Sequence, residues 1–178
     1  MTAHRGFTLI ELLVTLAIAA ILASLAVPTF HTLLVNARLK TAAESLQNGI
    51  SIARAQAVQL NTLVEFTLTD TGGWTVGRTD NLDEFLQQSS NRERAEGLAL
   101  TTTPAGASKV TFTSLGQVLA QNVSGDAWDP INTVDITPSS QDDLLNKHIT
   151  PLRIQLQSSG TSRLCDPSAA STSPKACL

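Results

Sequence analysis

The stretch that decides the fold is Gly6-Phe7-Thr8-Leu9-Ile10-Glu11-Leu12, from which a largely apolar run continues to Val27. A short polar leader, residues 1–6, precedes the run and carries Arg5. A helix over residues 7–27, at about 1.5 Å per residue, is about 30 Å long and would cross a bilayer. Glu11 lies inside this run, where an ionised carboxylate costs about 2.5–3.5 kcal/mol on insertion scales. Such an acid predicts a functional site with a positively charged partner.

The Gly-Phe-Thr-Leu-Ile-Glu-Leu stretch resembles the class III signal of type IV pilins and type II secretion pseudopilins. The resemblance implies that a prepilin peptidase cleaves after Gly6 and that the new N-terminal residue, Phe7, is methylated. It also implies that Glu11 meets the N-terminal amine of a neighbouring subunit in the filament. A buried carboxylate is tolerated when a cation pairs with it, and a newly exposed α-amine is such a cation.

Two other interpretations of this N-terminus compete with the pilin signal. Ser24-Leu25-Ala26 fits the cleavage site of an ordinary secretory signal, but Glu11 breaks the apolar region of such a signal. The second interpretation is a plain single-span membrane anchor. It agrees in part with the pilin signal, because a pilin is held in the membrane before assembly. Arg5 on the short flank predicts an N-terminus in the cytoplasm. We therefore expect a single-pass inner-membrane protein that becomes periplasmic or extracellular in a pilus or pseudopilus.

The first helix is expected to continue past the membrane, so that one helix covers residues 7–60 and is about 80 Å long. Pro28 predicts a kink, because its missing N–H leaves a backbone carbonyl unsatisfied one turn earlier. Beyond Pro28, apolar residues recur in alternating steps of four and three and form an amphipathic stripe that needs a partner surface. The stripe consists of Leu39, Ala43, Leu46, Ile50, Ala53, Ala57 and Leu60.

Residues 61–178 predict a β-rich head. The expected fold class is therefore α+β, with a long N-terminal helix, half transmembrane and half amphipathic, packed on a mostly antiparallel β head. Residues 80–108 are polar and are expected to be irregular. The expected strands cover residues 62–69, 74–79, 109–112, 117–119, 131–137 and 152–157.

Cys165 and Cys177 lie close together near the end of the head. In a chain exported to an oxidising compartment, a lone pair of cysteines predicts a disulfide, and two buried thiols are the alternative. Closing a loop of this size contributes about 3 kcal/mol in the chain-entropy model.

The chain beyond the first helix resembles the GspH/FimT family of minor pilins and pseudopilins. The resemblance rests on Ile-Ala-Arg-Ala-Gln-Ala at 52–57, Leu-Asn-Thr-Leu-Val at 60–64, Val-Thr-Phe at 110–112 with Gly116, and Ser-Gly-Thr-Ser-Arg-Leu-Cys-Asp-Pro at 159–167. The ending with its cysteines is more similar to FimU- and FimT-type minor pilins than to secretion pseudopilins. This implies a non-catalytic minor type IV pilin that primes or caps the pilus. Its partners would be other minor pilins, the major pilin and the inner-membrane assembly platform; a GspH-like minor pseudopilin of type II secretion is the alternative.

A DNA-binding subunit at the pilus tip, serving natural transformation, is a further alternative. The chain after residue 60 has 8 basic and 13 acidic residues, a net charge of 8 − 13 = −5, which argues against broad electrostatic binding. Residues 144–178 carry 4 basic residues against Asp166, a net charge of 4 − 1 = +3. FimT-like DNA binders have Gly-Arg-x-Arg before the first cysteine, whereas Gly160-Thr161-Ser162-Arg163 matches only at the last arginine. Pairing of Arg163 with Asp166 or with solvent is the simpler interpretation. The candidate DNA contacts are Lys147, Arg153, Arg163 and Lys175.

Catalysis and metal binding have little support. His4 leaves with the leader and His31 lies at the membrane edge, so His148 is the remaining candidate base in the head. The acidic stretch at 80–84 lacks the alternating oxygen ligands and the glycine of a calcium loop, and a solvated loop is expected there. We therefore expect no enzyme activity, no cofactor and no metal.

Overall fold

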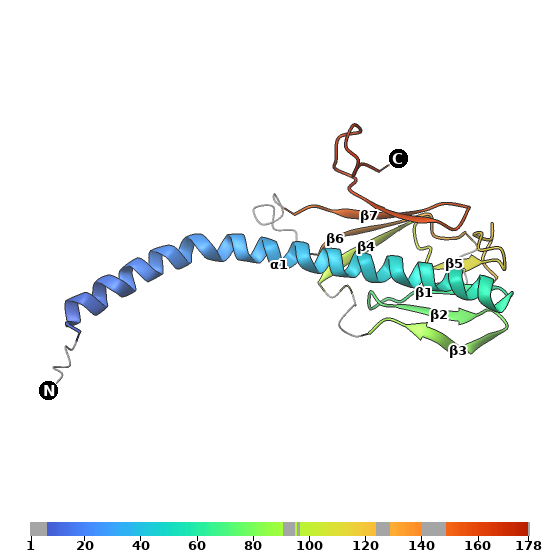
Figure 1. The fold of residues 1–178 in the computed structure, drawn as a ribbon, viewed down its shortest axis with the longest axis horizontal. Coiled ribbons are helices and arrows are strands. Elements are labelled where there is room, and N and C mark those ends of the chain that lie inside the picture. The colour runs from blue at the N-terminus through green and yellow to red at the C-terminus, as the bar shows by residue number, and fades with distance from the viewer. Residues whose placement is uncertain (1–6, 91–94, 96, 124–128, 140–148, 178) are drawn as a thin grey trace.

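The computed structural model describes residues 7–90, 95, 97–123, 129–139 and 149–177, with the backbone alone at 25–29, 31 and 82–84. One long helix, α1 (Leu9–Leu60), packs with its C-terminal half against two four-stranded sheets, and its N-terminal half extends away from them (Figure 1). Every strand pair is antiparallel. The α+β fold class is therefore confirmed. Gly6 and the rest of the predicted leader lie outside the described residues.

Helix α1 begins after its N-cap, Thr8, and ends at Leu60, just before its C-cap, Asn61, whose backbone adopts the left-handed conformation with φ 51°. The predicted end at residue 60 is confirmed. The helix is unbroken through Pro28, and Figure 1 shows a gentle curve in its N-terminal half. Within the described residues, no helix has both the length and the apolar character needed to cross a membrane. The kink and the transmembrane half stay predictions.

The first sheet has the strand order β3-β2-β1-β5. Its central strand, β1, pairs with β2 on one side, where Phe66 faces Val76, and with β5 on the other, where Phe66 faces Val110. The strands are β1 (Val64–Leu68), β2 (Trp74–Arg78), β3 (Asn81–Gln88) and β5 (Lys109–Phe112).

The second sheet has the order β4-β6-β7-β8. Its inner strands β6 and β7 place Val134 opposite Ile154, and both residues are buried. The strands are β4 (Leu98–Thr103), β6 (Thr133–Pro138), β7 (Leu152–Leu156) and β8 (Ser162–Cys165).

The predicted strands at 62–69, 74–79, 109–112, 131–137 and 152–157 correspond to β1, β2, β5, β6 and β7. The expectation of irregular structure over residues 80–108 is wrong, because this segment holds β3 and β4. Strand β8 was not expected, and residues 117–119 form only a bridge between Val118 and Phe112. Strand β4 pairs with a strand far away in sequence, β3 pairs with β2 across a bulge, and β8 is a short edge strand, so local composition carries little signal for them.

The core forms where the predicted stripe of α1 meets both sheets. Six of its seven residues are at most 2% exposed, whereas Leu60, at the end of the helix, is 40% exposed. The sheets contribute alternating residues, as expected when one face of a strand is buried. Their largest fully buried side chains are Val64, Phe66, Val76, Val110, Phe112, Val134, Ile136 and Ile154.

Candidate functional site

The pilin-like signal folds into a reciprocal cap at the start of α1. The backbone N–H of Glu11 donates to the hydroxyl of Thr8 at 3.3 Å, and the backbone N–H of Thr8 donates to Oε2 of Glu11 at 3.5 Å. This is a capping box, which satisfies two backbone donors that the first helical turn leaves free. The carboxylate of Glu11 is therefore bonded to the amide between Phe7 and Thr8, next to the amine that cleavage after Gly6 would create.

The N-terminal half of α1 has apolar side chains that the head does not cover. Phe7 is 85% exposed, and Ile10 and Leu13 are 66% and 54% exposed. A contiguous apolar surface of this kind marks an interaction with protein or membrane. The exposed large apolar residues of this half are Phe7, Leu9, Ile10, Leu12, Leu13, Val14, Leu16, Ile18, Ile21, Leu22, Phe30, Leu33 and Leu34.

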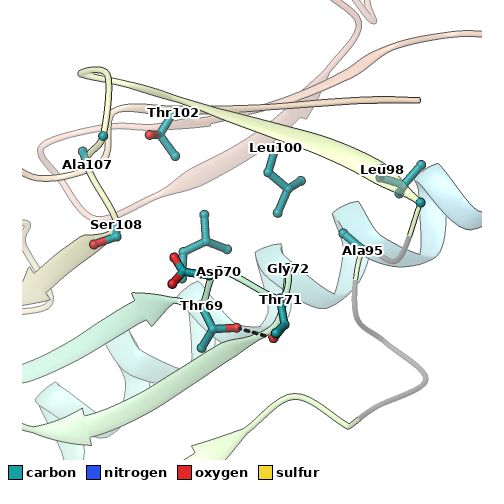
Figure 2. Close-up of a pocket in the computed structure, with 13 residues that line it drawn as sticks. Thr69, Asp70, Thr71, Gly72, Ala95, Leu98, Leu100, Thr102, Ala107 and Ser108 are labelled. Atoms are coloured by element: carbon teal, nitrogen blue, oxygen red, sulfur yellow. Dashed lines mark hydrogen bonds between the residues drawn. The ribbon is translucent and has the colours of Figure 1, made fainter. Parts of the chain in front are cut away.

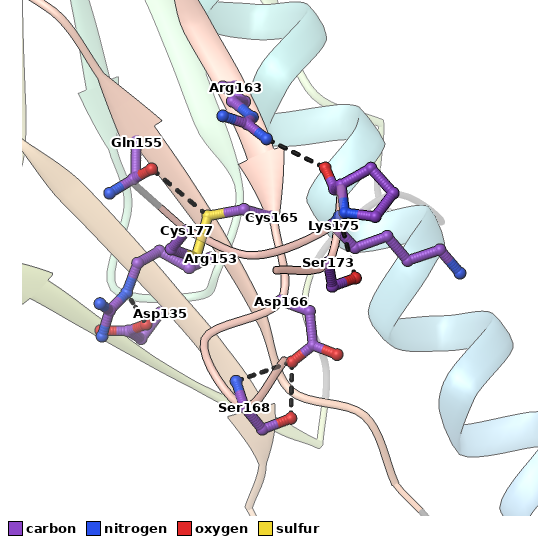
Figure 3. The surroundings of a disulfide bond; sticks show 11 residues. Asp135, Arg153, Gln155, Arg163, Cys165, Asp166, Ser168, Ser173, Lys175 and Cys177 are labelled. Atoms are coloured by element: carbon purple, nitrogen blue, oxygen red, sulfur yellow. Dashed lines mark hydrogen bonds and ion pairs between the residues drawn. A yellow bond between two sulfur atoms is a disulfide. The ribbon is translucent and has the colours of Figure 1, made fainter. Parts of the chain in front are cut away.

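The disulfide between Cys165 and Cys177 is present, with the two Cα atoms 5.1 Å apart (Figure 3). The closed segment folds back on itself, because the N–H of Asp166 donates to the carbonyl of Lys175 at 2.8 Å. The Asp166 carboxylate also accepts from the backbone and hydroxyl of Ser168 at 2.8 Å and 2.6 Å. The predicted bond is confirmed, and it anchors a compact C-terminal loop on β8.

The predicted basic ending is not one free basic surface. Arg153 donates twice to Asp135, at 2.6 Å and 2.9 Å, and this hydrogen bonding raises the pKa of the Arg153 guanidinium. Arg163 donates to the carbonyl of Pro174 at 3.0 Å (Figure 3). Of the two partners expected for Arg163, Asp166 and solvent, Asp166 is not among its described contacts. Lys175 is exposed, and Lys147 lies outside the described residues.

A groove of about 520 Å³ lies between β4 and the turn that joins β1 to β2 (Figure 2). Leu98, Leu100 and Thr102 form one wall, and residues 69–72 lie opposite. Asp70 is the ionisable residue among the lining side chains, and the hydroxyls of Thr69 and Thr71 lie 3.1 Å apart.

Two family models match this chain. Residues 1–27 match the prokaryotic N-terminal methylation motif, and residues 42–172 match the type II transport protein GspH. The second match covers most of the chain. The protein belongs to the GspH family.

Solved structures of minor pilins share the fold of this GspH-family protein. The type IV minor pilin FimU of Pseudomonas aeruginosa is 19% identical, with a TM-score of 0.55 over 76% of this chain and 93% of that chain. The minor pseudopilin EpsH of the type 2 secretion system of Vibrio cholerae is 21% identical, with a TM-score of 0.50 over 74% and 99% of the two chains. These structures show the shared fold, and together with the two family matches they confirm the resemblance to the type IV pilin and pseudopilin superfamily.

The remaining candidate sites of this GspH-family protein are the acidic stretch at 80–84, a metal site and His148. Residues 80–84, expected to be a solvated acidic loop, enter β3, and a hydrogen bond from Arg78 lowers the pKa of the Asp80 carboxyl. Among the residues that the structure describes, no three histidine, cysteine or acidic side chains come together as metal ligands. His148 lies outside the described residues.

Sequence reasoning missed a buried polar cluster around Glu65, because a glutamate in an alternating strand predicts a solvated side chain.

Proposed function

We propose that the protein is a minor type IV pilin, a structural subunit that primes or caps pilus assembly. The observation that carries the proposal is the division of α1 into two halves. The C-terminal half is buried against the head, whereas the N-terminal half, directly after the pilin signal, has an apolar surface that the head leaves bare. Only a membrane or other apolar helices can cover such a surface favourably, and a pilin meets both in turn.

The proposed assembly has three steps. A prepilin peptidase cleaves after Gly6 and the amine of Phe7 is methylated, while α1 holds the protein in the inner membrane with its head outside. The apolar half then packs against the helices of other minor pilins and the major pilin on the assembly platform. Glu11 pairs with an N-terminal amine of a neighbouring subunit. The capping box supports this role, because it fixes the carboxylate at the end of the helix where that amine would arrive.

A minor pseudopilin of type II secretion is the second candidate, and the GspH match over residues 42–172 favours it. The disulfide-closed ending, which resembles FimU- and FimT-type pilins, is the reason to place the pilus first. DNA capture at the tip has less support, because Arg153 is paired with Asp135 and the chain after residue 60 has a net charge of −5.

Deletion of the gene in its native host separates the two candidates. For a minor pilin, surface pili and twitching motility should fall and return when the full chain is supplied, while protein secretion stays normal. Loss of secreted enzymes with a normal number of pili would reverse the ranking. Normal pili and normal secretion would contradict both.

A further inference from the structure

The groove between β4 and the turn after β1 runs beside an open edge of the second sheet, and neither feature has a part in the proposed function. Strand β4 is the first in the order of its sheet, and β6 is its partner among the described strands. The carbonyl oxygens of Gly97 and Thr103 accept from the backbone N–H groups of Ser139 and Asn132, on the side of β6. Strand residues direct their backbone groups to alternate sides, so the odd-numbered residues of β4 bond to β6 and the even-numbered ones point their backbone groups outwards.

The outward backbone groups of Leu100 and Thr102 line this open edge. Their two N–H groups and two carbonyl oxygens have no hydrogen-bond partner within the part of the chain that the structure describes. Leu98, which also points outwards, donates its N–H to the carbonyl of Ala95 at 3.0 Å. An open strand edge with unpaired N–H and C=O groups is a template for pairing with another chain.

The side chains of the same β4 residues face the groove. Leu98, Leu100 and Thr102 form one of its walls (Figure 2). In the register with β6, Leu100 lies opposite Ile136, which belongs to the buried core, and Leu98 and Leu100 pack against that core. The groove of about 520 Å³ therefore continues the core out to the edge of β4. A strand added at this edge would place every second side chain in the groove.

Asp70 gives the groove a negative charge. It is the ionisable residue among the described lining side chains, it is exposed, and no basic side chain that the structure describes pairs with it. The wall formed by Leu98 and Leu100 is apolar. A fitting occupant therefore combines apolar side chains with one positive charge, because opposite charges attract across an interface and like charges there cost affinity.

We propose that the edge of β4 binds an extended peptide segment of a partner protein, which joins the second sheet as a fifth, antiparallel strand. In this direction each segment residue opposite Leu100 or Thr102 exchanges two backbone hydrogen bonds with it. The side chains of these segment residues enter the groove, where apolar ones cover Leu98 and Leu100 and one basic side chain meets Asp70. Strand addition of this kind takes its affinity from the main chain and its specificity from alternate side chains.

Fluorescence titration of the detergent-purified full-length protein with labelled heptapeptides tests the proposal. The parent peptide is Ser-Val-Ser-Val-Ser-Val-Ser, and two further sets replace one valine in turn by lysine or by aspartate. We expect the best lysine peptide to bind about three- to tenfold more tightly than the aspartate peptide with the same replaced position. If no peptide binds and light scattering shows a dimer, the edge pairs with a second copy of this chain and the proposal is wrong. If no peptide binds and the protein is a monomer, the proposal is equally wrong.

Backbone methylation of the best lysine peptide shows whether its main chain carries the binding. In an added antiparallel strand, the residues that enter the groove also direct their N–H groups to β4, and the serines direct theirs away. Peptides with N-methylated valines should therefore lose binding, whereas peptides with N-methylated serines should keep most of it. Equal binding of the two sets would overturn the addition of a strand.

A reversal of charge locates the bound peptide. In Asp70→Lys the order of the lysine and aspartate peptides should reverse, because the charge beside the groove has changed sign. Glu44→Lys is the matched control, since Glu44 is exposed on α1, does not line the groove and should leave the order unchanged. If the lysine peptide still binds more tightly in Asp70→Lys, the peptide lies elsewhere on the protein and the proposal is wrong.

Discussion

The indole N–H of Trp74 donates to the hydroxyl of Ser45 at 2.9 Å, and this buried bond joins β2 directly to α1. An indole buried in a core needs a partner for its single donor, and a serine facing the sheet provides one. The ring also stacks against Phe66, with the two centroids 6.2 Å apart. The helix can approach this closely because its next turn presents Gly49, which has no side chain, to the indole.

Gly49→Ala should destabilise the head. A Cβ at this position would lie 2.6 Å from Cδ2 of Trp74 and 2.9 Å from Cε2 of Phe66. The same change in a solvated helix stabilises by about 1 kcal/mol, so a net loss of about 1–3 kcal/mol here would mean an overpacking cost of about 2–4 kcal/mol. Urea unfolding of the head, residues 30–178, gives the difference. Asn48→Ala, exposed on the neighbouring position, is the control and should change the free energy of unfolding by less than about 0.5 kcal/mol.

Gly160→Ala should cost more than Gly106→Ala, although the two glycines have nearly the same backbone conformation, with φ +82° and +81°. At Gly106 an added Cβ meets nothing within 4 Å, so only the left-handed strain of about 1–2 kcal/mol applies. At Gly160 it would overlap the carbonyl oxygen of Gly116, which also accepts a hydrogen bond from Arg54. Equal losses in thermal unfolding of the two variants would show that this close approach does not constrain the head.

The sequence predicted the elements whose signals are local. The alternating four-and-three stripe and its end at Leu60 defined α1, and a lone cysteine pair in an exported chain predicted the disulfide. Strand β4 was missed because Leu98 pairs with Pro138, forty positions later, and β3 was missed because it pairs with β2 through a shifted register. The cluster around Glu65 was missed because it brings together residues that lie far apart in sequence, with Thr111 contacting both Glu65 and Asn122.

Glu11→Gln and Glu11→Val separate the two roles of this side chain. A glutamine at this position still completes a capping box, whereas valine removes both the cap and the charge. If charge pairing with a neighbouring amine drives assembly, both variants should insert in the membrane normally and both should be depleted from pili. Immunoblots of membranes and of sheared pili measure the two quantities. Wild-type incorporation of Glu11→Gln would assign the role to the cap alone.

The basic ending predicts weak, sequence-tolerant binding of duplex DNA at most. With Arg153 neutralised by Asp135, Arg163 and Lys175 are the two basic side chains that remain to meet phosphates within the part of this ending that the structure describes. Two phosphate contacts give a slope of about −1.8 in a plot of log affinity against log salt, and removing one charge should flatten it by about 0.9.

Fluorescence titration of labelled duplex with the detergent-purified protein, over a series of salt concentrations, measures this slope. Arg163→Gln should weaken the binding and flatten the slope, whereas Arg153→Gln should leave both unchanged, because its guanidinium is already held by Asp135 on the same sheet. A steeper slope that also falls in Arg153→Gln would mean that the ion pair opens to reach DNA. Tight binding abolished by Arg163→Gln alone would make DNA capture the primary role of this ending. The acidic balance of the head argues against that outcome, since a net negative surface repels the duplex before the two basic residues can meet it.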